Sequence, residues 1–183
     1  MYFKNLLLTL FAAGLVSATN PEKTTTFEVL SLRSASQIHF AYFQAAKSKI
    51  LLNLLDQKAA CASESDNAAT FKLTNGNLYL YHEPKTPQQL YVDRSKTGQG
   101  RLRYTTDGST APGRWERRGW KIDAYGNLSF NGDGFVACPN GIDGSWVIWV
   151  NVGVSQPGGG KGCLGLIART SNVEEPNSCK YTQ

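Results

Sequence analysis

The stretch 131-NGDGFVACPNGIDGSWVIWVNVGVSQPGGGKGC-163 decides the fold that the sequence predicts. Within it, residues 145–154 place apolar side chains on both faces of an extended strand. Trp146, Ile148 and Val150 fall on one face, and Val147, Trp149 and Val152 fall on the other side or just beyond it. A strand that is apolar on both faces is typical of a buried position. We therefore expect this segment to be the central strand, held near both ends by Cys138 and Cys163.

Short apolar segments at hairpin spacing make up the rest of the chain. The clearest pair, 71–74 and 78–81, alternates in period two around the turn Asn75-Gly76-Asn77. Segment 49–54 is also compatible with a helix, and a strand is favoured because its surroundings are predicted as strand. The predicted strands are 27–32, 37–43, 49–54, 71–74, 78–81, 89–93, 101–105, 120–123, 128–130, 134–137, 146–152 and 164–169. About a dozen short strands predict an all-β domain, either a single compact barrel or a sandwich.

The ends of the chain predict a secreted protein. Residues 1–18 combine Lys4 with a short apolar run and small residues at the end, as in a secretory signal peptide. Residues 19–26 are polar and predict a flexible arm whose threonines can carry O-linked sugar, and 27–183 form one β domain. The polar C-terminal residues 177–183 predict no GPI signal, and we expect no membrane anchor.

Charge favours a glycan partner over nucleic acid. Without the segment that contains Lys4, 18 basic and 14 acidic residues remain, a net charge of +4. A mild positive charge on a secreted protein suits anionic glycans or simple solubility, and such a protein rarely meets nucleic acid.

Four cysteines, Cys61, Cys138, Cys163 and Cys179, follow the predicted signal peptide. In an oxidising compartment they predict two disulfides. Of the three pairings we favour Cys61–Cys138 with Cys163–Cys179, because the second bond closes a short loop and ties down the tail. The spacings and the presence of only two histidines argue against a metal site.

No motif predicts catalysis or a cofactor. The run Gly158-Gly159-Gly160-Lys161-Gly162 lacks the Ser or Thr of a phosphate-binding loop and predicts a turn. His39 and His82 lie in or at the end of predicted strands without a nucleophile elbow. Carboxylates that a glycosidase would need are present, but most of the aspartates among them adjoin glycines, as is ordinary in turns. They are Asp93, Asp107, Glu116, Asp123, Asp133 and Asp143.

A basic and aromatic stretch, residues 93–121, is the candidate binding surface. It contains eight Lys and Arg against three Asp and Glu. Rings stack on sugar faces and guanidinium groups bind hydroxyls or acidic groups, so the stretch predicts a surface for polysaccharide. The candidate residues are Arg101, Arg103, Trp115, Arg117, Arg118 and Trp120. The alternative is a solvated face whose aromatic residues lie in the core.

Asn127-Leu128-Ser129 is an N-glycosylation sequon beside the turn at Gly126. Its occupancy would place this edge of the sheet at the surface.

Several segments together resemble the PhiA-type family of fungal cell wall proteins, which are associated with phialide and conidium development. They are 27–29, 32–39, 89–93, 135–139, 146–150, 157–159, 162–163 and 179–181. The resemblance implies secretion and a place in the cell wall, and it supplies no catalytic residue.

Together these observations predict a secreted, non-enzymatic fungal cell wall protein that is structural or glycan-associating and takes part in asexual development. Two alternatives remain: a secreted elicitor or effector that binds a host component, and a hydrolase of wall polysaccharide.

Overall fold

The computed structural model describes residues 24–83, 88–105, 109 and 115–183. The predicted signal peptide and residues 19–23 of the predicted arm lie outside this range. The described strands are β1 (Thr24–Leu32), β2 (Gln44–Ala46), β3 (Lys49–Leu52), β4 (Ala60–Cys61), β5 (Phe71–Thr74), β6 (Asn77–Leu80), β7 (Gln88–Asp93), β8 (Arg101–Tyr104), β9 (Trp120–Ile122), β10 (Asn127–Phe130), β11 (Phe135–Cys138), β12 (Trp146–Val150), β13 (Leu164–Asn172) and β14 (Cys179–Lys180). Two 3₁₀ turns, Ile142–Gly144 and Pro157–Gly159, complete the regular structure, and no helix of the described chain is long and apolar enough to cross a membrane.

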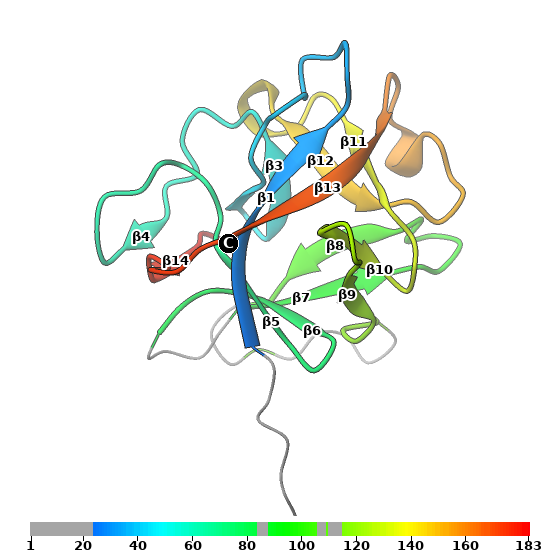
Figure 1. Cartoon of the computed structure of the whole chain (residues 1–183). Helices are drawn as coiled ribbons and strands as arrows, with labels where there is room; N and C mark the ends of the chain where they lie inside the picture. The colour runs from blue at the N-terminus through cyan, green and yellow to red at the C-terminus, as the bar shows by residue number, and fades with distance from the viewer. Residues whose placement is uncertain (1–23, 84–87, 106–108, 110–114) are drawn as a thin grey trace, which may run out of the picture.

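Eight of these strands form a closed antiparallel barrel (Figure 1). Around the ring their order is β12, β8, β7, β6, β5, β1, β13 and β11, and β11 closes the ring by pairing with β12. The hairpin of β2 and β3 continues from β12, and the hairpin of β9 and β10 continues from β13. The all-β prediction is therefore confirmed, and of the two forms considered the structure is the barrel.

Two strands of the ring change partner along their length. One edge of β12 pairs with β3 through Trp146 and Val147 and then with β8 at Trp149. One edge of β13 pairs with β11 through Leu164–Leu166 and then with β10 at Ala168 and Arg169. The predicted central position of β12 is confirmed, because it contacts β3, β8 and β11. Only its inner face is fully buried, however, and Val147 and Trp149 are half-exposed.

The barrel interior holds one apolar core built from the inward residues of every strand in the ring. Its largest fully buried side chains include Phe27, Phe43, Phe71, Tyr104, Phe130, Phe135 and Tyr181. Burying one such ring stabilises the fold by about 1.5–3 kcal/mol relative to leaving it exposed.

Most strand predictions are confirmed within a residue or two, whereas one predicted strand and the end of the predicted arm are wrong. The predicted strand 37–43 is mostly turns, because Phe40 adopts a positive φ of 61° that interrupts an extended chain. The predicted arm ends three residues too late, since Thr24, Thr25 and Thr26 belong to β1 and pair with β5. Backbone partners on β5 and β-branched side chains favour the extended conformation there.

Buried glutamines supply hydrogen bonds where the strand ladders stop. The Gln88 side chain donates to Tyr181 O at 3.0 Å and accepts from Tyr181 N at 2.8 Å. Gln44 makes the same pair of bonds with Leu54, each 2.7 Å long. Gln57 accepts from Ala45 N and donates to Ala68 O. Each amide thus acts as a strand partner for buried backbone groups that would otherwise be unsatisfied.

The two predicted disulfides form, but with a different pairing. Cys61 bonds to Cys179, joining β4 to β14, and Cys138 bonds to Cys163, joining the end of β11 to the start of β13. The favoured pairing of Cys163 with Cys179 is wrong because β13 lies between them. Its nine residues extend the chain by roughly 30 Å, so Cys163 lies at the start of the strand and the chain reaches Cys179 only after it has left the other end.

The C-terminal tail closes one end of the barrel. Tyr181 is 1% exposed, its hydroxyl accepts a hydrogen bond from Thr70 N at 3.0 Å, and burial raises its pKa to about 12. Tyr104, at the end of β8, donates its hydroxyl to Thr182 O, and burial likewise raises its pKa. The disulfide at Cys179 holds this tail in place.

We predict that the disulfide of the tail stabilises the protein more than the other one. The bonds span 118 and 25 residues, and their loop entropies are worth about 5 and about 3.5 kcal/mol. Cys61→Ser with Cys179→Ser should therefore lower the free energy of unfolding, measured in denaturant, more than Cys138→Ser with Cys163→Ser. An equal or reversed order would contradict this. Peptide mapping of the unreduced wild type provides the control for the pairing.

We also predict a loss of stability at alkaline pH. The Tyr181 pKa of about 12 lies above the unfolded value of about 10, so its contribution is complete below pH 10 and is lost as pH rises towards 12. The loss should amount to at most about 3 kcal/mol for this residue. Tyr181→Phe should be less stable at neutral pH, because Thr70 N loses its partner, and should show a shallower alkaline decline. Unfolding free energies of the wild type and of Tyr181→Phe, measured from pH 8 to 12, test these expectations. Equal declines of the two proteins with pH would refute the alkaline loss assigned to Tyr181.

Candidate functional site

The outer faces of β7, β8 and β12 carry rings and arginines side by side. Along each strand the side chains alternate, so that Leu90, Leu102 and Ile148 point into the core while their neighbours point outward. The register places Tyr91 opposite Arg103, and Arg101 opposite Trp149. We call the outward residues Tyr91, Arg101, Arg103 and Trp149, together with Trp115, the aromatic–basic band.

Each end of the band contains a tryptophan ring with a partner. At one end the Trp115 ring lies over Tyr91 with 4.7 Å between ring centroids. This contact leaves Tyr91 9% exposed, and burial raises its pKa, while the charge of Arg103 acts in the opposite direction. At the other end the guanidinium carbon of Arg101 lies 5.9 Å from the centroid of the Trp149 ring. The strands that carry the two ends, β7 and β12, are two strand spacings apart, roughly 10 Å.

Trp149 separates two shallow hollows on the surface. One, of about 340 Å³, is lined by Lys49, Arg101 and Arg103, and the other, of about 440 Å³, lies towards Pro139 and Lys161. Both share Val147, Trp149 and Gly158. The salt bridges between described residues involve none of Lys49, Arg101 and Arg103. The first hollow therefore combines positive charge with a ring, which suits an acidic or hydroxylated ligand.

The structure divides the six predicted surface residues. Arg101, Arg103 and Trp115 belong to the band, and their role in binding stays a prediction. The prediction that Trp120 is a surface ring available for stacking is wrong. Its side chain is 3% exposed and packs against Phe130 with 4.9 Å between ring centroids. Arg118 is exposed but lies elsewhere, where its Nε donates to Asn75 O at 3.2 Å. Arg117 is half-buried and lines neither of the two hollows beside Trp149.

The sequence analysis did not predict that Trp149 lies at the surface. It assigned both faces of residues 145–154 to the interior, whereas only the face with Ile148 is buried. The alternation of Arg101 with Leu102 in β8 was a usable signal, because it marks the outer face of the strand next to β12.

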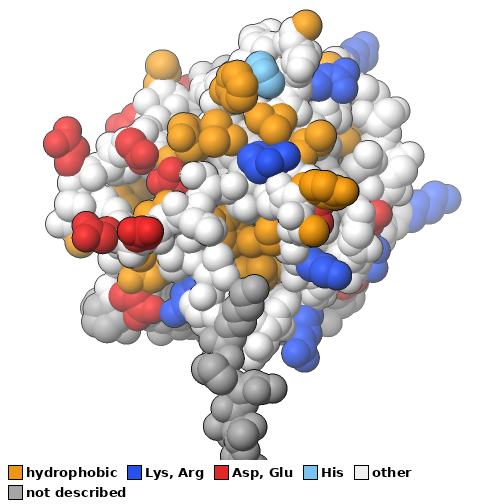
Figure 2. Space-filling model, viewed as in Figure 1, with side chains coloured by type: hydrophobic (Ala, Val, Ile, Leu, Met, Phe, Trp, Pro, Cys, Tyr) orange, Lys and Arg blue, Asp and Glu red, His pale blue; other side chains and the backbone are white. Residues whose placement is uncertain are grey.

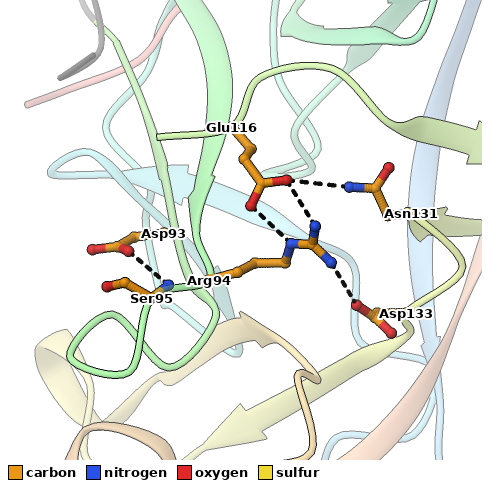
Figure 3. Close-up of polar contacts among 6 residues, drawn as sticks. All are labelled: Asp93, Arg94, Ser95, Glu116, Asn131 and Asp133. Atoms are coloured by element: carbon orange, nitrogen blue, oxygen red, sulfur yellow. Dashed lines mark hydrogen bonds and ion pairs between the residues drawn. The ribbon is translucent and has the colours of Figure 1, made fainter. Parts of the chain in front are cut away.

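A second polar cluster lies at the end of β7 (Figure 3). Arg94 donates Nε and Nη2 to the carboxylate of Glu116 at 2.9 and 2.8 Å, and Nη1 to Asp133 at 3.5 Å. Asn131 also donates to Glu116, at 3.3 Å, and the pairing with Glu116 raises the pKa of Arg94. A hollow of about 470 Å³ opens beside these residues. Since Arg94 also lies 5.8 Å from the Phe130 ring, the cluster covers this end of the core.

The other candidate carboxylates and histidines have local structural contacts. Asp93 accepts from Ser95 N, and Asp123 accepts from Tyr125 N and Asn127 N, bonds that lower the Asp123 pKa. His39, in a turn and not in the predicted strand, accepts from Arg33 N. His82 lies 3.5 Å from Ser178 Oγ, which donates to Glu83 O. Asp143 lies in a 3₁₀ turn, and Asp107 lies outside the described residues.

The sequon residue Asn127 begins β10 and is half-buried. Its Nδ2 donates to Asp123 at 3.0 Å, and its Oδ1 accepts from Arg169 at 3.0 Å. A glycan on Nδ2 would leave one N–H for the bond to Asp123. Occupancy stays a prediction.

Comparison with known proteins places the chain among fungal wall proteins. The model of a family described as PhiA-like secreted protein matches residues 27–182. The chain is 44% identical over 182 residues to the cell wall protein phiA of Aspergillus niger, which covers 100% of this chain and 99% of that protein. It is 43% identical over 185 residues to the protein of that name in Aspergillus fumigatus, and the match covers both chains completely. It is 41% identical over 177 residues to the protein of that name in Emericella nidulans, and the match covers 96% of this chain and 95% of that protein. No solved structure gives a significant match.

The turn that packs on Trp149 yields a prediction. Gly158 has a φ of 67°, and a Cβ there would lie 2.8 Å from Trp149 Cη2. Gly159, with a φ of 75°, is the matched control, because a Cβ there would have no atom within 4 Å. Both substitutions to Ala should cost about 1–2 kcal/mol of backbone strain. Gly158→Ala should cost at least about 1 kcal/mol more and alter tryptophan fluorescence, measured during denaturant unfolding. Equal losses would show that the turn does not pack on the ring.

Proposed function

Because the chain belongs to the PhiA-like family of secreted proteins, we propose that it is a non-enzymatic protein of the fungal cell wall that associates with wall polysaccharide. The wall location is supported by the relatives named cell wall protein phiA. The proposal includes a part in asexual development, in the formation of phialides and conidia, which the family resemblance suggests.

The pairing of Trp149 with Arg101 on the outer face of the barrel carries the glycan proposal. An indole ring stacks on the apolar face of a sugar, and a neighbouring guanidinium donates hydrogen bonds to hydroxyl or acidic groups. The second ring cluster, Trp115 over Tyr91, lies across β8 from the first. Such a row of rings and cations fits an extended chain of sugars better than a small molecule in an enclosed pocket.

The contacts of the carboxylates support a role without catalysis. Glu116 and Asp133 are both bound to the Arg94 guanidinium. A glycosidase needs one carboxylic acid to protonate the leaving group and a second carboxylate facing it across the bond. Glu116 and Asp133 instead bind one guanidinium together, and Asp93 and Asp123 accept hydrogen bonds from backbone N–H groups within turns.

Binding of the purified, oxidised mature protein to insoluble chitin, β-glucan and whole fungal wall, at low and at high salt, tests the proposal. We expect retention on at least one polymer to persist at high salt, where surface charge attraction is screened within about 3 Å. Trp149→Ala should weaken that binding about tenfold, the effect of losing roughly 1.4 kcal/mol of stacking. Arg101→Ala should weaken polymer binding by a smaller factor than Trp149→Ala does. That factor should be larger at low salt than at high salt.

Tyr125→Ala is the matched control, because this ring is 78% exposed and lies in the turn before β10, away from the band. It should bind like the wild type. No retention on any polymer would reject the proposal and favour a secreted elicitor that acts on a host component. If retention were lost entirely at high salt, binding would depend on charge attraction alone and not on stacking of the Trp149 ring on a sugar.

A further inference from the structure

Exposed apolar side chains gather on the outer face of β1 and β13, on the opposite side of the barrel from β8. Phe40 is 65% exposed, Ile167 52% and Tyr42 41%. Leu30 and Leu32 of β1 are half-exposed beside them. We call these five residues the β1–β13 face. Figure 2 shows apolar side chains gathered on this side of the molecule.

The hydrogen-bond register places the five residues in two adjacent rows. Leu32 pairs with Ile167 on one side, and Phe40 N donates to Ser31 O on the other. Leu30 pairs with Arg169 on one side and forms a bridge with Tyr42 on the other. The face is therefore a continuous three-chain surface and not a set of scattered apolar residues, and a surface of this kind marks an interaction site.

The chain holds Phe40 outward at a conformational cost. Its φ of 61° is rare for a bulky residue, and its ring stacks on His39 with 3.8 Å between centroids. The loop around it is fixed by bonds from Arg33 N to His39 Nδ1 and from Ser36 Oγ to Arg33 O. A ring that is held rigidly in solvent loses little entropy when a partner covers it.

Charge changes sign along the face. Arg33 follows Leu32, so the end of the face beyond Leu32 is basic, and Arg169 lies within the rows, opposite Leu30. Beyond them Glu28 pairs with Ser171, and its pKa is raised by burial and by the nearby charge of Asp66. Glu174 and Glu175 follow Val173, whose N–H bonds to Thr26 O. In Figure 2 the acidic side chains lie mainly on the left and the basic ones mainly on the right.

We propose that a second copy of this chain docks on the β1–β13 face to form a two-fold symmetric dimer. A two-fold axis that lies in the interface and crosses the strands brings the basic end of one face onto the acidic end of its copy, and reciprocally. The apolar rows then lie together at the centre, with the row of Leu32 and Ile167 facing the row of Leu30 and Arg169 of the copy. A surface whose rows are mainly apolar in the middle and opposite in charge at their ends is complementary to itself. This proposal does not rest on glycan binding.

Sedimentation velocity of the mature, oxidised protein over a range of concentrations tests the dimer. We expect a concentration-dependent dimer in the wild type. Ile167→Lys places its charge against Arg169 of the copy at the centre and should raise the dissociation constant at least tenfold. Leu55→Lys is the matched control, because Leu55 is an 89% exposed apolar residue outside the face, and it should dimerise like the wild type.

A second variant separates association from folding. Phe40→Gly removes the exposed ring and also relieves the positive φ, so its free energy of unfolding should not fall while its dimer weakens. A wild type that is monomeric at every concentration would overturn the proposal. So would a dimer that Ile167→Lys and Phe40→Gly leave unchanged.

Discussion

Closure of the hydrogen-bond ladder around the barrel is the constraint on which the rest of the structure depends. β11 has only four residues, yet it pairs with β12 on one side and with β13 on the other. Without it, β12 and β13 would each expose an unpaired edge, which favours aggregation. Where the ladders end, Gln44, Gln57 and Gln88 continue the bonding through their side chains. Closure also fixes which residues face outward, because a shift of one residue turns every side chain to the opposite face.

The ring fixes the relative positions of the two surfaces proposed here. β8 and β1 are four strands apart in a ring of eight, so the aromatic–basic band and the β1–β13 face lie on opposite sides of the barrel. A dimer formed through the second surface would leave both bands facing outward and away from each other. Such a particle would hold two separate polysaccharide chains, and its avidity for an insoluble polymer would exceed that of a single band.

Sequence reasoning was strongest where the structure is local. Period-two alternation around Asn75-Gly76-Asn77 predicted a hairpin that the register confirms, because a turn and its flanking strands interact within a few residues. Alternation also showed that Arg101 and Arg103 share a face. It could not show which face of Trp120 or Trp149 is inside, since that depends on strands distant in the sequence. The cysteine pairing failed for the same reason, because the loop between Cys163 and Cys179 is short in sequence but contains a fully extended strand.

The adjacency of the first and last long strands has a consequence for how the protein is made. β1 pairs with β13, and Cys61 pairs with Cys179, so the barrel closes only when nearly the whole chain has entered the secretory pathway. Cys61 and Cys138 emerge before either native partner, and their mispaired bond is the first one available to an oxidising enzyme. If that bond forms, native protein is reached only after thiol exchange, and the yield then depends on disulfide isomerisation more than on the rate of translation.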